Sequence, residues 1–202
     1  MRRKKLCPVC RNKYTPTRDL QAVCGNYQCA IEKGRQDDAK RKRKRLKAGR
    51  EGLKSKKVWL NEAEDACRRL IRARDRLYYA KLGQPPTCIS CGTQKPGTQY
   101  AAGHHKTAGG HPELRFDERN IFLQCNRFCN KELSGNINGT KTTHGYIKGL
   151  AIRFGQEKAD EILDYLNSYH EPLNLTVDDI KAMQKDFNYR ANEAEKELRG
   201  ME

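Results

Sequence analysis

Cysteines that occur in close pairs are the feature that most restricts how this chain can fold. Eight of its nine cysteines form four pairs whose members lie three to five positions apart. The pairs are Cys7 and Cys10, Cys24 and Cys29, Cys88 and Cys91, and Cys125 and Cys129. Such a pair can direct both sulfurs to one metal ion, and two pairs complete a tetrahedral zinc site. Only 36% of the residues are hydrophobic, so we expect small units held by metal and not one large core.

The simplest assignment pairs these cysteines in the order of the sequence. The first four then close a zinc knuckle within residues 1–34, and the last four close a larger loop within residues 85–140. Four thiolates saturate a structural zinc ion, so His104, His105 and His111, which lie inside the second loop, are left over. The alternative is a site built from the third cysteine pair and two of these histidines. In the sequential assignment the chain holds two structural zinc ions.

Zinc is expected in place of disulfides because of the compartment that the sequence indicates. The first residues, "MRRKKLCPVC", carry charge without the apolar region of a signal peptide. No window approaches the roughly 20 apolar residues of a membrane span. We therefore expect a soluble cytoplasmic protein with no membrane partner, in surroundings that keep thiols reduced. The ninth cysteine, Cys67, lies in a helical pattern and is expected to be a buried small hydrophobe.

Positive charge is concentrated at the start of the chain. Residues 1–57 contain 20 Lys and Arg against 5 Asp and Glu, whereas residues 58–202 contain 21 against 20. This asymmetry indicates a basic helix or arm, at residues 35–57, that binds a polyanion such as DNA. A solvated, disordered linker is the alternative. The candidate DNA contacts in the densest run are Lys40, Arg41, Lys42, Arg43, Lys44, Arg45 and Lys47.

The segments outside the cysteine loops have helical patterns. Residues 58–84 repeat apolar residues three or four positions apart, as in an amphipathic helix, and residues 141–202 are expected to be helical as well. A break is expected near Gly155, and Thr176 begins a long final helix with Asp179 at its capping-box position. Their amphipathic pattern suggests that these C-terminal helices, from about residue 142 onward, either join two copies into a homodimer or grip the DNA junction.

The central residues 85–140 are expected to form a knuckle, a hairpin with "KPGT" (residues 95–98) as its turn, and a loop that enters a helix. The fold class is therefore α+β and mostly helical. The polar face of the preceding amphipathic helix carries four arginines. By their pattern alone, they are as well explained by contacts to phosphate as by simple exposure to solvent. They are Arg68, Arg69, Arg72 and Arg76.

This zinc-stapled β, β, α order, with a histidine at the end of a strand and asparagines after it, resembles the HNH, or ββα-metal, nucleases over residues 88–136. The chain is still more similar to the NinG, or Rap, family of phage recombination proteins. That similarity rests on the first cysteine knuckle, the basic run, and the motifs "TCISCGT", "AGHHKTAGG", "LRFDERNIFLQC", "CNKELSGN" and "FGQEKADEI". The resemblance implies an endonuclease that cuts branched DNA, such as Holliday junctions and D-loops, in the cytoplasm of the phage host.

Phosphodiester hydrolysis needs a base to deprotonate water and a divalent ion to neutralise charge on the phosphate and the departing oxygen. His104 is the candidate base because neutral imidazole accepts a proton near pH 7. His105 takes that role, or that of a metal ligand, if the strand register shifts by one residue. Asn120 is expected to hold the histidine loop through side-chain hydrogen bonds. Asn130 lies where this nuclease class places a ligand for a catalytic Mg²⁺ or Mn²⁺ ion, with His104 as a second candidate ligand.

The resemblance is incomplete in front of the histidines. HNH sites carry an acidic residue directly before the catalytic histidine, and the NinG pattern has an aspartate three positions before it, where this chain has Gly103 and Ala101. A carboxylate for the catalytic ion must therefore come from elsewhere, although Glu118 can instead pair with Arg115 or Arg119. The candidates from the following loop are Glu113, Asp117 and Glu118.

A second function class fits part of the same evidence. The basic run and the first knuckle suit a non-catalytic, zinc-containing DNA-binding module, such as a recombination mediator, and neither feature needs His104. Cleavage of branched DNA in the presence of magnesium separates the two classes.

Overall fold

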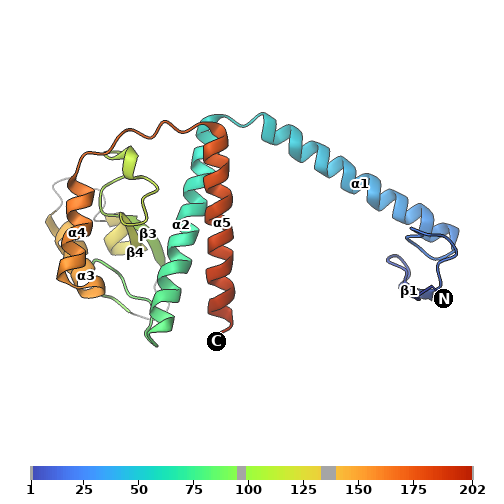
Figure 1. Cartoon of the computed structure of the whole chain (residues 1–202), viewed down its shortest axis with the longest axis horizontal. Helices are drawn as coiled ribbons and strands as arrows, with labels where there is room; N and C mark the ends of the chain where they lie inside the picture. Colours follow the sequence, from blue (N-terminus) through green and yellow to red (C-terminus); the bar gives the residue numbers. More distant parts are fainter. Residues whose placement is uncertain (1, 95–98, 133–139, 202) are drawn as a thin grey trace. The chain divides into compact units, whose positions relative to one another are not determined.

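The computed structural model describes residues 2–94, 99–132 and 140–201, without the side chains of residues 127, 131, 132 and 140–144. The hairpin turn predicted at residues 95–98 lies outside the described residues. The chain divides into two compact units, Met1–Ser55 and Lys56–Glu202 (Figure 1). The predicted fold class is confirmed, because helices predominate and the described strands form two small antiparallel sheets.

The first unit consists of a small knuckle and one long helix. Strands β1 (Lys5–Leu6) and β2 (Lys13–Tyr14) pair antiparallel, and α1 (Tyr27–Gly52) follows. The Asn26 side chain caps this helix by accepting a hydrogen bond from the backbone N–H of Gln28. The helix is continuous from Tyr27, so the expected boundary between a knuckle at residues 1–34 and an arm at residues 35–57 falls inside one element.

The second unit contains the remaining elements. They are α2 (Lys56–Lys81), β3 (Tyr100–His104), the 3₁₀ helix η1 (Pro112–Leu114), β4 (Ile121–Cys125), the π-helix η2 (Asn126–Glu132), α3 (Thr140–Phe154), α4 (Gln156–Asn167) and α5 (Val177–Arg199). The final helix has the predicted capping box between Thr176 and Asp179. Gly155, with φ of +86°, separates α3 from α4 at the predicted break.

The hairpin of β3 and β4 is covered on both faces. Its antiparallel register sets His104 opposite Ile121 and Gly103 opposite Phe122. Opposed residues share a face and successive residues alternate, so these two pairs lie on opposite faces. Ile121 packs in a core with α2 and α5, whereas Phe122 packs in a second core with α3 and α4. In Figure 1 the two strands lie between α2 on one side and α3 and α4 on the other. All five residues of β4 are buried as a result.

Helix α5 lies beside α2 and runs in the same direction (Figure 1). Its buried residues Ile180, Phe187 and Ala191 share a core with residues of α2. Arg69 of α2 donates to both carboxylate oxygens of Glu195. It therefore links α2 to α5 and does not lie on the free polar face of α2 that the sequence pattern predicted. The apolar stripe of α5 is thus covered within one chain. A homodimer formed through the C-terminal helices stays a prediction, and the stripe of α5 is not available for it because α2 already buries that stripe.

Helix α3 lies directly on the backbone of the second knuckle. A Cβ atom at Gly145 would be 2.2 Å from the carbonyl oxygen of Ser90, and one at Gly149 would be 1.7 Å from that of Ile89. Only glycine permits such an approach. The cysteines at residues 88 and 91 are therefore supported by a helix that begins more than 40 residues later in the sequence.

Among the residues that the structure describes, no helix combines the length and the apolar character that crossing a membrane requires.

Candidate functional site

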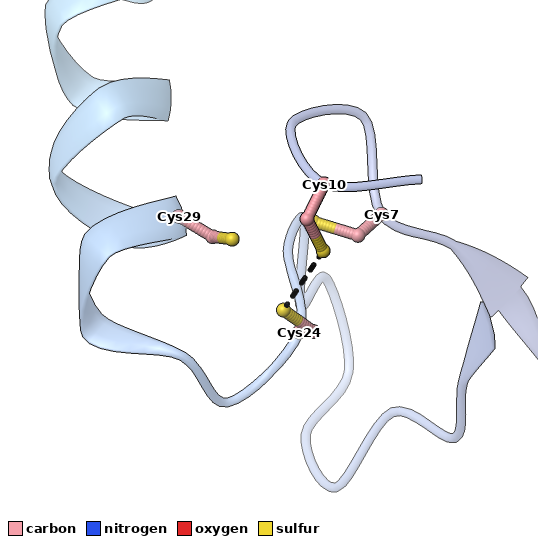
Figure 2. A group of neighbouring side chains, drawn as sticks. All are labelled: Cys7, Cys10, Cys24 and Cys29. Carbon is pink, nitrogen blue, oxygen red and sulfur yellow. Dashed lines mark hydrogen bonds between the residues drawn. The ribbon is translucent and has the colours of Figure 1, made fainter. Parts of the chain in front are cut away.

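The first four cysteines form one cluster. Cys7, Cys10 and Cys24 lie on loops and Cys29 lies in the first turn of α1 (Figure 2). Their sulfurs all lie within 4.8 Å of one another, and the Sγ atoms of Cys10 and Cys24 are 3.7 Å apart. A tetrahedral zinc ion with Zn–S bonds of about 2.3 Å separates its sulfurs by about 3.8 Å. Backbone hydrogen bonds from Cys10 and Cys24 lower the pKa of the Cys7 thiol to about 6, which favours the thiolate that binds metal.

The last four paired cysteines form a second cluster with the same geometry. Cys88, Cys91, Cys125 and Cys129 also lie within 4.8 Å of one another, and the Sγ atoms of Cys91 and Cys125 are 3.8 Å apart. The backbone N–H of Cys125 donates to the Sγ of Cys88 at 3.2 Å. Both clusters are therefore compatible with structural zinc in the sequential assignment. The alternative that used histidines with the third cysteine pair is wrong, because two further cysteines complete this cluster.

Cys67 stands apart from both clusters. It is buried in the core between α2 and α5, and burial raises the pKa of its thiol to about 12. The prediction of a buried small hydrophobe is confirmed.

His104 ends β3 on the face of the hairpin that packs on α2. Its Nε2 lies 3.0 Å from the carbonyl oxygen of Arg115. A carbonyl oxygen can only accept, so Nε2 carries the proton and Nδ1 keeps a lone pair. Burial lowers the pKa of this imidazole, and the positive charges of Arg68 and Arg115 lower it further. His104 is therefore neutral at pH 7 and can accept a proton.

His105 has different surroundings on the opposite side. Its ring packs against Tyr146 of α3 with 5.1 Å between centroids, and its Nδ1 is buried without a hydrogen-bond partner in the part of the chain that the structure describes. Burial, with a smaller contribution from Lys106, lowers its pKa to about 4. The Tyr146 hydroxyl donates to the backbone carbonyls of Gly103 and Asn120, which fixes α3 to both strands at this end of the hairpin. The two candidate bases thus lie on opposite faces.

Asn120 closes the loop that follows the histidines. Its side chain is fully buried; Oδ1 accepts from the backbone N–H of Lys106 at 2.7 Å, and Nδ2 donates to the carbonyls of Lys106 and Leu114. These bonds hold the two ends of the loop together. A contribution of Asn120 to catalysis stays a prediction.

Asn130 lies in η2, directly after Cys129 of the second cluster. Its Nδ2 lies 3.3 Å from Oδ1 of Asn126, one helical turn earlier in η2. The role of Asn130 as a ligand of a catalytic ion stays a prediction.

The three acidic residues of the loop have partners away from His104. Glu113 pairs with His111 at 3.1 Å, and Asp117 pairs with Arg119. The expected pairing of Glu118 with Arg115 or Arg119 is wrong, because Glu118 reaches the helices instead. Its partners are Arg74 of α2 and Arg190 of α5.

The carboxylate that the structure places near His104 is Glu64 of α2, which the sequence analysis missed. Its oxygens lie 3.0 Å from Nη1 of Arg115 and 2.7 Å from Nη2 of Arg68. Its charge opposes the lowering of the His104 pKa. Glu64 precedes His104 by 40 residues, and the only sequence signal for it was a place on the polar face of an amphipathic helix.

The seven basic residues predicted to contact DNA lie on the exposed surface of α1. The segment is helical, as one of the two expected forms. Arg41 pairs with Asp38, and Lys47 lies 4.0 Å from Glu51. The sequence has no acidic residue between these two carboxylates, so the run keeps most of its positive charge.

Comparison with known proteins gives a family match over nearly the whole chain. The family model described as "Bacteriophage Lambda NinG protein" matches residues 1–197. "Protein ninG" of Escherichia phage 933W is 35% identical over 204 aligned residues, which cover 93% of this chain and 92% of that protein. "Protein ninG" of Escherichia phage lambda is 36% identical over 146 residues, 72% of this chain and 62% of that protein. That of Salmonella phage P22 is 35% identical over 146 residues, with the same coverage. No solved structure matches the chain.

Proposed function

We propose that this chain, which belongs to the NinG family of bacteriophage proteins, is a metal-dependent endonuclease of the HNH type that cuts branched DNA such as Holliday junctions and D-loops in the host cytoplasm. The environment of His104 carries the proposal. Its Nε2 is held by the Arg115 carbonyl, so its Nδ1 has the lone pair that a general base needs.

In the proposed reaction His104 takes a proton from water through Nδ1, and the resulting hydroxide attacks the phosphorus atom. The same lone pair cannot also bind a metal ion, so the base and ligand roles considered for His104 exclude each other. Asn130 is then the proposed oxygen ligand, and a bound Mg²⁺ or Mn²⁺ ion would neutralise charge on the phosphate and the departing 3′ oxygen. Asn120 keeps the histidine loop closed around the site through its buried amide.

Positive charge near His104 suits a phosphate. Arg68 and Arg115 are close enough to lower the His104 pKa, and both also pair with Glu64. The exposed cations of α1 would add affinity that does not depend on DNA sequence. Cutting a four-way junction symmetrically calls for two active sites, so the proposal includes a second copy on the substrate.

One observation favours a non-catalytic DNA-binding module instead. The acidic residues that follow the histidines are all engaged in ion pairs elsewhere. Glu64, the carboxylate near His104, is held by two arginines. A module that binds branched DNA without cutting it would need no carboxylate for a metal ion.

The test compares cleavage of a labelled four-way junction by the intact protein and by His104→Ala with Mg²⁺ present. We expect His104→Ala to keep its zinc, fold and junction affinity while cleavage falls by about 100- to 10,000-fold. His111→Ala is the matched control, since that half-exposed side chain pairs with Glu113, and it should cleave normally. The rate of the intact protein should rise with pH, and the midpoint of the rise should lie below the ordinary histidine value of about 6.5, because burial lowers the His104 pKa.

A His105→Ala protein distinguishes the remaining outcomes. If it is folded and inactive while His104→Ala cleaves normally, the base is His105. If both variants and the intact protein bind the junction and none cleaves it, the protein is the non-catalytic module.

A further inference from the structure

An aromatic-lined pocket lies on the face of the hairpin opposite His104. It has a volume of about 470 Å³, within the range of about 300–1,000 Å³ that small-molecule sites have. We call it the aromatic pocket, and its rings come from α2, β4, α3 and α4. They are Tyr78, Phe122, Phe154 and Tyr165.

Two planar groups in the aromatic pocket keep an exposed side. Phe154 is 36% exposed as a residue, and its ring is backed by Phe122, with 5.6 Å between the ring centroids. The guanidinium of Arg119 lies 3.3 Å over the centroid of the Tyr165 ring, and its side chain is half-exposed. A benzene ring and a guanidinium plane are both surfaces on which a flat heterocycle stacks.

Arg153 lines the aromatic pocket and packs against its rings. Its side chain is only 5% exposed, and its Nη2 donates to Asp75 at 2.8 Å. Its Nε and Nη1 are buried without a hydrogen-bond partner among the described residues, and its guanidinium lies 4.2 Å from the centroid of the Tyr78 ring. The same guanidinium lies 5.0 Å from the Phe122 ring centroid and 5.1 Å from that of Phe154, so the rings cover it and Arg153 makes this wall a packed, flat surface.

The balance of charge decides which ligand fits. The cations of the aromatic pocket are already neutralised, since each has a carboxylate partner, so a free phosphate finds little net attraction there. A neutral planar group fits better, because it can stack on Phe154 and on the Arg119 guanidinium without needing a net charge. The pairs are Arg74 with Glu118, Arg119 with Asp117, Arg153 with Asp75, and Lys158 with Glu161.

We propose that the aromatic pocket binds an unstacked nucleobase of branched DNA. This inference rests on the proposed function for the identity of the polymer. A base at a branch point or an unpaired position leaves the stack at lower cost than a paired one. The aromatic pocket would therefore favour branched over continuous duplex DNA, while the α1 cations bind both alike.

The test measures binding without divalent ions, so that cleavage plays no part. The probes are a duplex with one unpaired base and the same duplex fully paired. Phe154→Ala should weaken binding to the first by about 5- to 150-fold, the range for loss of one stacked base, and leave binding to the second unchanged. Tyr169→Ala is the matched control, because Tyr169 is 84% exposed and does not line the aromatic pocket, and it should change neither affinity.

Arg119→Ala is a second test in case Phe154→Ala does not fold. The Arg119 side chain is half-exposed, so its removal should leave the fold intact and give the same selective loss of binding to the DNA with the unpaired base. An iodouracil at the unpaired position should cross-link to an aromatic residue of the pocket. The inference is overturned if each variant loses the same affinity for both DNAs, or none, and no cross-link forms in the aromatic pocket. The proposed function would still stand in that case. The aromatic pocket would then bind another group, such as an aromatic side chain of a partner protein. A protein that binds neither DNA overturns both.

Discussion

His104 and His105 are adjacent in the sequence, yet the hairpin turns them into chemically different groups. His104 has a carbonyl partner for Nε2 and charged neighbours on α2. His105 packs on Tyr146, and none of the described residues forms a hydrogen bond with its Nδ1. An imidazole in that position is held neutral, because burial disfavours the charged form and the positive charge of Lys106 disfavours it further.

The His105 environment should make folding sensitive to acid. Its pKa is about 4 in the folded protein and about 6.5 when unfolded. As pH falls below 6.5, the unfolded chain binds a proton at His105 and the folded protein does not. The folded state is therefore fully stabilised by this residue above pH 6.5, and that stabilisation decreases as pH falls to about 4. The upper limit of the loss is about 3 kcal/mol. In urea unfolding, the free energy of the intact protein should therefore fall relative to that of His105→Phe as pH drops from 7 to 4.

Loss of zinc at low pH affects both proteins, so only the difference between their unfolding free energies is informative. His111→Phe serves as the control, because that side chain is 44% exposed. A difference between the intact protein and His105→Phe that stays constant with pH would contradict the prediction.

At the scale of elements, Asp75 joins three parts of the second unit. This fully buried carboxylate of α2 accepts from the backbone N–H of Leu123 in β4 at 2.7 Å. It also pairs with Arg153 of α3 at 2.8 Å and with Arg74 at 2.9 Å. The hairpin and α3 are therefore tied to α2 by charge as well as by apolar packing.

Removing that charge should be costly. Asp75→Asn keeps the shape but leaves the buried Arg153 without its counter-ion, and breaking a buried pair in this way costs about 3–5 kcal/mol. Asp65→Asn is the matched control on the same helix, since Asp65 pairs with Arg68 while 76% exposed, and it should cost less than about 1 kcal/mol. Urea unfolding measures both, and equal small effects would show that Asp75 is not the link between these elements.

At the scale of the whole molecule, each compact unit contains its own four-cysteine cluster. In the first unit, Cys29 is the buried residue that α1 contributes, so little apolar packing holds its knuckle. In the second, the cluster ties residues 88–91 to the end of β4 and to η2. A structural zinc ion supplies about 10 kcal/mol or more of folding free energy, so each unit should depend on its own ion.

We expect elemental analysis to find two zinc ions per chain, and one in either Cys7→Ser or Cys88→Ser. Limited proteolysis should then open only residues 1–55 in the first variant and only residues 56–202 in the second. Cys67→Ser is the control, because Cys67 is buried outside both clusters, and it should keep both ions. One ion in the intact protein, or zinc loss in the control, would contradict this arrangement.

The local signals of the sequence determined a large part of this protein. The cysteine spacing predicted both clusters, the charge run predicted an exposed basic segment, and the capping box and Gly155 predicted helix ends in the C-terminal region. Each of these depends on a few neighbouring residues, because a metal-binding pair, a cap or a left-handed residue acts over one turn of chain.

The tertiary structure alone decided what surrounds the histidines. The sequence has no signal that brings Glu64 to His104, Asp75 to β4, or α2 onto the apolar stripe of α5. It could not assign the two histidines to their faces either, because one residue of register exchanges the faces and only the pairing of β3 with β4 sets that register. Contacts between distant segments depend on which surfaces bury one another, and burial is a property of the packed molecule and not of any stretch of its sequence.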